Sequence, residues 1–314
     1  MIEAPGERAG EHTAFELGAL LPAHLEAARA LLAAACQHDA ADRVAPEKLF
    51  GPAAGHPESR ALGAWAGQAL VGVAAVSGAW IRLLAVHPAH RGRGVGSALL
   101  AAAEDATAAI ESPGARVMRV LDQPGNYLAP GVDLRNHETI AWLGRRGYVQ
   151  HGERVNLLVD VRTNPRVSAA RAQALAAACA GYELRRAQPG DAGALTAMIT
   201  AGFSATWAFE ASQAMRAQPP AVHVAVERQR GELVAFAAHD GNNRDLGWFG
   251  PTGTLPEHRG RGLGAALLCA CLVDVATAGH ATCEVAWIGP RAFYDRIAGI
   301  AGERRFAAMR KELS

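Results

Sequence analysis

The same segment occurs twice in this chain of 314 residues. The stretch from Pro88 to Leu100 returns from Pro256 to Leu268, and both copies read Pro-x-His-Arg-Gly-Arg-Gly-x-Gly before a run rich in alanine and leucine. The offset stays at 168 residues (88 to 256) through the whole segment, which chance rarely produces. Because a chain of this length also exceeds the size at which single cores stop growing, we predict a duplicated unit with two cores.

The surroundings of the two copies follow one plan. Each copy comes after alternating or apolar runs typical of strands and before a run typical of a helix. The expected elements are strands at 60–65, 69–76 and 81–86 with a helix at 97–109, and strands at 222–227, 233–238 and 247–250 with a helix at 265–277. This order predicts an α/β fold of the α+β type, with a sheet flanked by helices in each half.

A break between the two halves is indicated at Asn164-Pro165. An alanine-rich run from Ser168 to Ala180 follows it and is typical of a helix, and a strand-like segment then starts at Tyr182. We therefore expect a first domain at residues 1–163, a helical linker at 164–180 and a second domain at 181–314.

The balance of charge disfavours several classes of partner. The chain has 31 Lys and Arg against 30 Asp and Glu, so it lacks the positive field that draws proteins to nucleic acid or anionic membranes. Half of the residues are apolar, which predicts a globular protein. We therefore do not expect nucleic acid or a membrane as partner. The chain is expected to be a monomer or a homodimer.

Neither a membrane span nor a secretion signal is indicated. The most apolar stretch, Ala69 to Val86, is interrupted by glycines and by Arg82, as expected for strands rather than for a membrane-spanning helix. The first residues lack a basic segment followed by an apolar run, so we expect a cytoplasmic protein. The five cysteines form no Cys-x-x-Cys pair, which favours free thiols and neither zinc nor disulfides.

The repeated segment has the properties of a phosphate site. A strand that ends in a glycine-rich turn and opens a helix points several unpaired N–H groups at one place, at the positive end of the helix dipole. Neither copy has the Gly-Lys-Ser/Thr ending of an ATP-binding loop. A dinucleotide-binding Gly-x-Gly-x-x-Gly would need glycine at Ser97 and Ala265, so both alternatives are disfavoured.

The remaining pattern, Arg-x-x-Gly-x-Gly in both copies, resembles the acetyl-CoA signature of the GNAT superfamily of N-acetyltransferases. The resemblance implies two GNAT-like domains, each with a mixed, mostly antiparallel sheet, and acetyl-CoA as the acyl donor without a metal. In that family the loop amides hold the CoA diphosphate, and the preceding strand pairs with the pantetheine arm. The CoA-binding residues that it implies are Ala85, Val86, Arg91, Gly92, Arg93, Gly94, Val95, Gly96, Ser97, Arg259, Gly260, Arg261, Gly262, Leu263, Gly264 and Ala265.

The family's later helix is similar to residues 136–148 in the first half and to 292–299 in the second. The tyrosine that the family places near the CoA sulfur falls on Leu143 in the first half and on Tyr294 in the second. Because a phenol can protonate a departing thiolate and leucine cannot, we predict that the second half is catalytic, with Tyr294 as general acid. The alternative is that Tyr294 only packs against its neighbours.

The transfer also needs a group that accepts the proton of the attacking amine. Asp240, Glu210 and Glu284 are the acidic candidates at expected strand or loop positions of the second half, and the alternative for each is a solvated carboxylate, which is the more common role of a single acidic residue. An unusual turn-rich loop at 122–133 is expected to border the acceptor site, with Tyr127 and Asp133 as candidate substrate contacts. The alternative is an ordinary surface loop.

Three functions follow from this reading. The first is acetyl-CoA-dependent N-acetylation of a small amine by direct transfer, with an amino sugar or an aminoglycoside-like compound as the leading candidate. The second is a CoA-binding scaffold or sensor in which one or both halves do not turn over, as Leu143 suggests for the first half. The third is N-acetylation of a protein or peptide.

Overall fold

The computed structural model describes residues 15–56, 58–108 and 117–313. The elements of the first half are β1 (Glu16–Ala19), α1 (Leu25–Ala35), α2 (Ala45–Phe50), β2 (Arg60–Ala66), β3 (Ala69–Ser77), β4 (Trp80–Val86), α3 (Val95–Ala108), β5 (Val117–Val120), β6 (Val132–Asp133), α4 (His137–Gly144) and β7 (Val149–Asp160). Short 3₁₀ helices occupy Pro22–His24 and Pro88–His90.

The second half repeats this order after a connecting helix. Its elements are α5 (Ala169–Ala177), β8 (Tyr182–Arg186), α6 (Ala192–Gly202), α7 (Ala205–Ala214), β9 (Val222–Glu227), β10 (Glu232–His239), β11 (Trp248–Thr254), α8 (Leu263–Thr277), β12 (Thr282–Val285), α9 (Arg291–Ala298) and β13 (Gly302–Glu312). Pro189–Asp191 and Pro256–His258 form 3₁₀ helices. The strands and helices expected around the repeat are confirmed, and α3 and α8 each start two residues earlier than expected, at Val95 and Leu263, because these apolar side chains are buried in the first turn.

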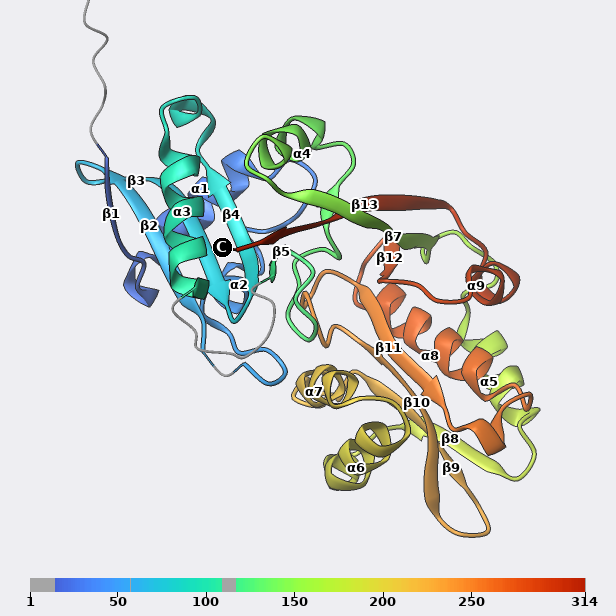
Figure 1. Cartoon of the computed structure of the whole chain (residues 1–314). Helices are drawn as coiled ribbons and strands as arrows, with labels where there is room; N and C mark the ends of the chain where they lie inside the picture. Colours follow the sequence, from blue (N-terminus) through green and yellow to red (C-terminus); the bar gives the residue numbers. More distant parts are fainter. Residues whose placement is uncertain (1–14, 57, 109–116, 314) are drawn as a thin grey trace, which may run out of the picture.

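The strands form one continuous sheet within the described part of the chain (Figure 1). Its order is β1-β2-β3-β4-β5-β13-β7-β12-β11-β10-β9-β8, with β6 beside β13. Only the β4–β5 and β11–β12 pairs are parallel among the described strands, and the other pairs are antiparallel. The predicted mixed, mostly antiparallel architecture is therefore confirmed.

The two halves exchange their last strands. The C-terminal strand β13 lies between β5 and β7, where Arg310 pairs with Arg119 of the first half. Conversely, β7 of the first half pairs with β12 of the second, with Val159 opposite Cys283. The sequence patterns gave no sign of this exchange, and the domain limits drawn at 163 and 181 stay a prediction.

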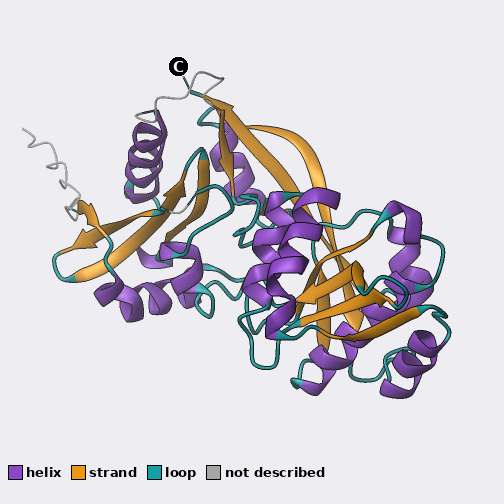
Figure 2. Ribbon diagram, turned by 90° about the horizontal axis from the view of Figure 1, so that it is seen from below, coloured by secondary structure: helices purple, strands orange, loops and turns teal. Residues whose placement is uncertain are grey.

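Helices cover both faces of each half of the sheet (Figure 2). In the first half, α1 and α2 pack on one face through side chains such as Leu31 and Leu49, and α3 packs on the other through Leu99. In the second half, α6 and α7 cover one face, and α5, α8 and α9 cover the other. Each half therefore has its own pair of apolar layers on a shared sheet.

None of the helices in residues 15–56, 58–108 and 117–313 is both long and apolar enough to cross a membrane. Within the same residues, no group of three or more His, Cys, Asp or Glu side chains is arranged to hold a metal ion. All five cysteines have free thiols.

Candidate active site

The two glycine-rich loops have the same backbone conformation. Gly92 and Gly94 have φ angles of 75° and 84°, and Gly260 and Gly262 have φ angles of 75° and 83°. These are left-handed conformations that residues with a Cβ rarely adopt. The four glycines are exposed and lead directly into α3 and α8, so the unpaired N–H groups of two helix starts face solvent at equivalent places.

The third glycine of each loop has a different role. A Cβ on Gly96 would lie 3.4 Å from the Trp142 ring, and a Cβ on Gly264 would lie 3.5 Å from the Phe293 ring. Glycine at these positions lets α4 and α9 pack closely against the helix starts. Trp142 and Phe293 are therefore equivalent, and the residues that follow them, Leu143 and Tyr294, occupy equivalent positions too.

The arginine that opens each motif fastens the loop to its strand. Arg91 donates a hydrogen bond from Nε to the carbonyl of Val86 at 3.3 Å, and Arg259 donates from Nε to the carbonyl of Thr254 at 3.1 Å. Both acceptors are the last residue of the preceding strand. Arg91 also donates a hydrogen bond from Nη2 to the carbonyl of Ala35 at 3.2 Å, so the structure places these arginines as supports of the loop.

The remaining predicted CoA-binding residues surround the same two helix starts. Arg93 and Arg261 are exposed, and the guanidinium of Arg261 lies 5.9 Å from the ring of Tyr182. Ser97 accepts a hydrogen bond from Arg146 at 2.6 Å. The other members of the set lie on the adjoining strand, at the buried base of each helix or in its first turn: Ala85, Val86, Val95, Leu263 and Ala265.

The strand before each loop separates from its parallel neighbour. β4 pairs with β5 only at Trp80 and Ile81, and β11 pairs with β12 only at Trp248 and Phe249. From residues 82 and 250 onward, the edge that faces β5 or β12 has no parallel partner among the described strands. An extended ligand arm can therefore pair with this edge on its way from the loop.

A β-bulge lies at the point where β4 separates from β5 and another where β11 separates from β12. The residue at the bulge differs between the halves. In β4 the extra residue is Arg82, which is fully buried and donates hydrogen bonds to the carbonyl of Gly51 and to Oε1 of Gln123. The equivalent residue of β11 is Gly250, with φ 130°, and a Cβ built there would meet nothing within 4 Å. The side chain of Arg82 thus occupies the bulge of the first half, whereas the bulge of the second half, at Gly250, has no side chain.

Tyr294 lies beside this open point on the face of the sheet that α8 and α9 cover. It is 7% exposed, and its ring lies 5.1 Å from that of Phe293 and 6.3 Å from that of Phe249. Burial raises the pKa of its phenol to about 12, and its hydroxyl has no hydrogen-bond partner among the described residues. Leu143, its equivalent, is part of the apolar core of the first half.

Glu210 lies on α7, which covers the opposite face. Its carboxyl accepts a hydrogen bond from the N–H of Gly125 at 3.1 Å, and burial raises its pKa to about 7. Gly125 belongs to the loop that also carries Tyr127, whose ring lies 6.1 Å from that of Trp248. Since Trp248 and Phe249 are successive strand residues on opposite faces, Glu210 and Tyr294 flank the start of β11 from the two sides.

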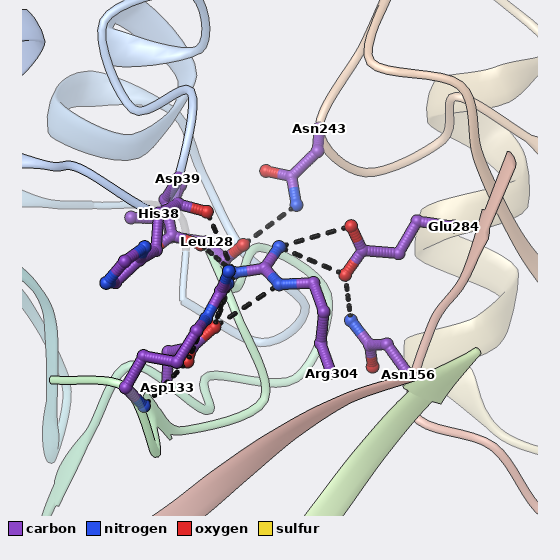
Figure 3. Close-up of polar contacts among 9 residues, drawn as sticks. His38, Asp39, Leu128, Asp133, Asn156, Asn243, Glu284 and Arg304 are labelled. Atoms are coloured by element: carbon purple, nitrogen blue, oxygen red, sulfur yellow. Dashed lines mark hydrogen bonds and ion pairs between the residues drawn. The ribbon is translucent and has the colours of Figure 1, made fainter. Parts of the chain in front are cut away.

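Glu284 lies on β12, the parallel neighbour of β11, and its carboxylate is bound to the guanidinium of Arg304 (Figure 3). Its carboxylate accepts hydrogen bonds from Asn156 at 2.6 Å and from Arg304 at 3.1 and 3.2 Å. Arg304 also contacts Asp39 at 2.6 Å and Asp133 at 3.0 Å. Burial raises the pKa of Glu284, although Arg304 opposes this effect.

The loop at 122–133 is buried between the two halves, unlike an ordinary surface loop. The side chains of Asn242 and Asn243 donate hydrogen bonds to the carbonyls of Tyr127 and Leu128 at 2.9 and 3.0 Å. Tyr127 is 6% exposed, and its surroundings raise the pKa of its phenol well above the ordinary value, with burial as the main cause.

Asp133 and Asp240 are both held by other residues of the chain. Arg135 and Arg304 bind both carboxylate oxygens of Asp133 and hold its pKa well below the ordinary value against the effect of burial. Asp240 accepts hydrogen bonds from His239 at 3.0 Å and from the N–H of Gly247 at 3.1 Å. The structure therefore brings Glu210, Tyr127 and Trp248 together, and neither Asp133 nor Asp240 joins them.

Two buried cations were not identified as site residues from the sequence. Lys48 has no exposed surface and donates hydrogen bonds to Glu47, Asn126 and Asn242 at 2.7, 2.8 and 2.7 Å. Arg82 is equally buried, and burial lowers its pKa to about 10. A single charge within the apolar strand 80–86 was the available signal for Arg82, whereas Lys48 stands in a short polar segment without such a signal.

A pocket of about 310 Å³, which we call the junction pocket, lies between the halves next to these groups. The first half contributes residues around α2 and the loop after β5, and the second half contributes α7 and the loop after β10. The lining residues are Arg43, Val44, Pro46, Glu47, Pro52, Gly125, Asn126, Phe209, Gln213, Gly241, Arg244 and Asp245.

Comparisons with known families and structures fit this geometry. Residues 57–150 match the acetyltransferase (GNAT) domain, and residues 193–299 match the acetyltransferase (GNAT) family. No match was found among curated proteins.

Several solved structures have a similar fold. A GCN5-related N-acetyltransferase from Sphaerobacter thermophilus is similar with a TM-score of 0.65 and 19% identity, covering 97% of each chain. A tandem GNAT protein from the clavulanic acid biosynthesis pathway gives a TM-score of 0.67 and 19% identity, over 95% of this chain and 98% of that one. A GCN5-related glucosamine N-acetyltransferase region in a fungal multi-domain GH3 beta-N-acetylglucosaminidase gives 0.72 and 18%, and this chain covers 95% of its own length but 38% of that protein.

Proposed function

This chain belongs to the GNAT acetyltransferases, of which it carries two domains in tandem, and we propose that its second half transfers an acetyl group from acetyl-CoA to a small amine. The observation that carries the proposal is the open bulge at Gly250, flanked by Tyr294 on one face of the sheet and by Glu210 on the other. The first half lacks this combination, because Arg82 and Leu143 stand at the corresponding places.

The residues of the second half fit acetyl-CoA as donor. The positive-φ glycines 260 and 262 and the free N–H groups at the start of α8 suit a diphosphate, and the unpaired edge of β11 suits an amide-bearing arm. Bound acetyl-CoA would supply the acetyl thioester that the amine attacks. A backbone N–H of β11 beside the bulge would stabilise the developing negative charge on the carbonyl oxygen.

Two side chains can move the protons that this transfer requires. Tyr294 stays protonated far above neutral pH, because burial raises its pKa to about 12, so it can donate a proton to the departing thiolate. Glu210 has a pKa of about 7 and is therefore half ionised near neutral pH, which suits a base that accepts the amine proton directly or through a water molecule. Glu284 is paired with Arg304, and we assign it to holding the β12–β13 region in place.

A small acceptor is the best-supported substrate class. A pocket of about 310 Å³ lies between the halves, and Phe209 supplies aromatic surface to its lining. One similar structure is a glucosamine N-acetyltransferase region, which keeps an amino sugar among the candidates.

Thiol release from acetyl-CoA, followed across a panel of amines, tests this proposal. Tyr294→Phe should lower kcat by about 100-fold or more, in the range of lost general acid catalysis. Tyr148→Phe in the first half is the matched control and should retain wild-type turnover. An absence of any melting shift with millimolar acetyl-CoA, or equal turnover in both variants, would contradict the assignment.

A second role for the first half is favoured by one observation. Its loop has the same glycine conformations as the second half, whereas Arg82 fills its bulge and Leu143 replaces the tyrosine. We propose that this half binds CoA without turnover. Calorimetry of Gly262→Val, which obstructs only the second loop, should still show binding of about one equivalent of acetyl-CoA.

A further inference from the structure

The junction pocket has guanidinium groups at its rim that no carboxylate neutralises. Arg43 donates from Nη2 to the backbone carbonyl of Asp245 at 2.7 Å, and neither Arg43 nor Arg244 forms an ion pair within the described residues. Both side chains are exposed and line the pocket from opposite halves of the chain. Arginine presents a planar set of donors that matches carboxylate and phosphate oxygens.

The acidic lining residues do not cancel this positive charge. Glu47 is already bound to the ammonium of Lys48 at 2.7 Å and accepts a hydrogen bond from the N–H of Asn243 at 3.3 Å. Asp245 is exposed, as Arg43 and Arg244 are, and its single charge offsets at most one of these two arginines.

Further positive charge lies under the pocket floor. Arg82 is fully buried, and it donates to the carbonyl of Gly51, next to Pro52 in the lining. Its Nη2 has no hydrogen-bond partner within the described residues. Lys48 and Arg82 face the carboxylate of Glu47 and the carboxyl group of Glu210, which burial keeps partly protonated near neutral pH, so the floor keeps a net positive charge. Such a region favours an anionic ligand.

The inner end of the pocket has the opposite character. Gly125 lines the pocket and donates its N–H to Glu210, and the other carboxyl oxygen of Glu210 accepts no hydrogen bond from the described residues. Phe209, the preceding residue of α7, also lines the pocket. The pocket therefore has a cationic rim and, at Gly125 and Phe209, a wall that adjoins the buried carboxyl group of Glu210.

We propose that the junction pocket binds the acceptor and that this acceptor carries an anionic group, a carboxylate or a phosphate, beside its amine. The anionic group lies against Arg43 and Arg244, and the amine lies toward Glu210. This inference rests on the proposed transferase function and narrows its substrate class to amines with a second, negatively charged group.

Calorimetric titration without acetyl-CoA tests the pocket separately from the reaction. The probes are two matched pairs, phosphoethanolamine with ethanolamine and lysine with cadaverine, in which each pair differs only by the anionic group. We expect the anionic member of at least one pair to bind at least tenfold more tightly than its partner, and the pair that shows this identifies phosphate or carboxylate. Equal affinity within both pairs would overturn the inference.

Variants of the rim locate the binding. Arg43→Gln and Arg244→Gln should each weaken the anionic probe at least tenfold and leave its uncharged partner unchanged. Arg145→Gln removes an equally exposed arginine elsewhere in the first half and should change neither. Loss of the preference in the control as well as in the rim variants would overturn the location, because a general charge effect would then explain it.

The result also separates this inference from the proposed function. Tight, arginine-dependent binding without acetylation of any probe would support the anionic pocket and contradict the transferase assignment. Acetylation of ethanolamine or cadaverine with no preference for the anionic partner would support the transferase and contradict the anionic pocket.

Discussion

The two halves of the molecule share a backbone plan and differ in the few side chains that stand at the separating strands. Both carry the glycine loop with φ angles near 75° and 84°, and in both the strand before it separates from its neighbour after two paired residues. At the bulge, one half has the buried guanidinium of Arg82 and the other has the bare backbone of Gly250. A duplicated glycine-rich loop can therefore persist while the strand position beside it is filled by a side chain in one copy and left bare in the other.

Filling the open bulge should have the largest effect. Gly250→Arg places in the second half the side chain that fills the first, and we expect acetyl transfer to fall to background, because even a 1 Å displacement of reacting groups costs about 100-fold. Gly231→Arg is the matched control: this glycine also has a positive φ, at 69°, and open space around its Cβ, but it lies at a hairpin turn. Steady-state thiol release and thermal melting measure both. Full activity in Gly250→Arg would show that the two halves do not differ at this point.

The next effect concerns the base on α7. Glu210→Gln should lower kcat by about 100-fold, and the rise of kcat/KM with pH through about 7 in the wild type should disappear, because an unprotonated Glu210 is the active form. A pH–rate profile of both proteins decides this. An unchanged rise in the variant would assign the titration to another group.

Glu210→Gln should increase the stability of the fold above pH 7, although it lowers kcat. The pKa of Glu210 is raised in the folded state, so its contribution is present below the unfolded pKa of about 4.5 and is lost as the pH rises through about 7. Above pH 7, Glu210→Gln should therefore be more stable than the wild type, by roughly 1–3 kcal/mol. Urea unfolding at pH 5 and pH 8 measures the difference, and equal stability gaps at both values would contradict the expectation.

The junction between the halves should respond to the removal of Arg304. Because Arg304 binds three carboxylates and is largely buried, Arg304→Met should cost about 3–5 kcal/mol of unfolding free energy. Its neighbour on the strand supplies the control, since Arg305 forms only an exposed pair with Glu153 and Arg305→Met should cost less than about 1 kcal/mol. Similar losses in the two variants would show that the cluster in Figure 3 does not hold the junction.

The smallest effect is expected from giving the first half a tyrosine. Leu143→Tyr restores the phenol, but Arg82 still fills the bulge, so we expect no measurable gain in turnover and a cost of about 1–3 kcal/mol from overpacking the core. Thiol release in a background of Tyr294→Phe detects any rescue. Recovered activity would mean that the missing tyrosine alone silences the first half.

Local patterns predicted the parts of the fold that depend on neighbouring residues. The glycine spacing predicted both loops and their helices, and alternation of apolar residues predicted the hairpins. The exchange of β7 and β13 could not be predicted, because it depends on pairings between segments about 150 residues apart along the chain, such as Leu158 with Gly302.

The candidate acids show the same limit. The sequence offered Glu210, Asp240 and Glu284 with equal weight, and only tertiary contacts distinguish a buried carboxyl with a pKa of about 7 from carboxylates held by His239 or Arg304. The sequence shows that Arg82 interrupts an apolar strand. That its side chain fills a bulge left open at Gly250 can be recognised only when the two bulges are compared in the structure.

The position of β13 bears on how the protein is made. Strand β5 meets its antiparallel partner only after residues 302–312 have been synthesised, because that partner is β13. Until β13 has left the ribosome, the first half has an open sheet edge beside β5, and such edges favour aggregation and chaperone binding. Completion of the sheet of the first half is thereby tied to synthesis of the second half.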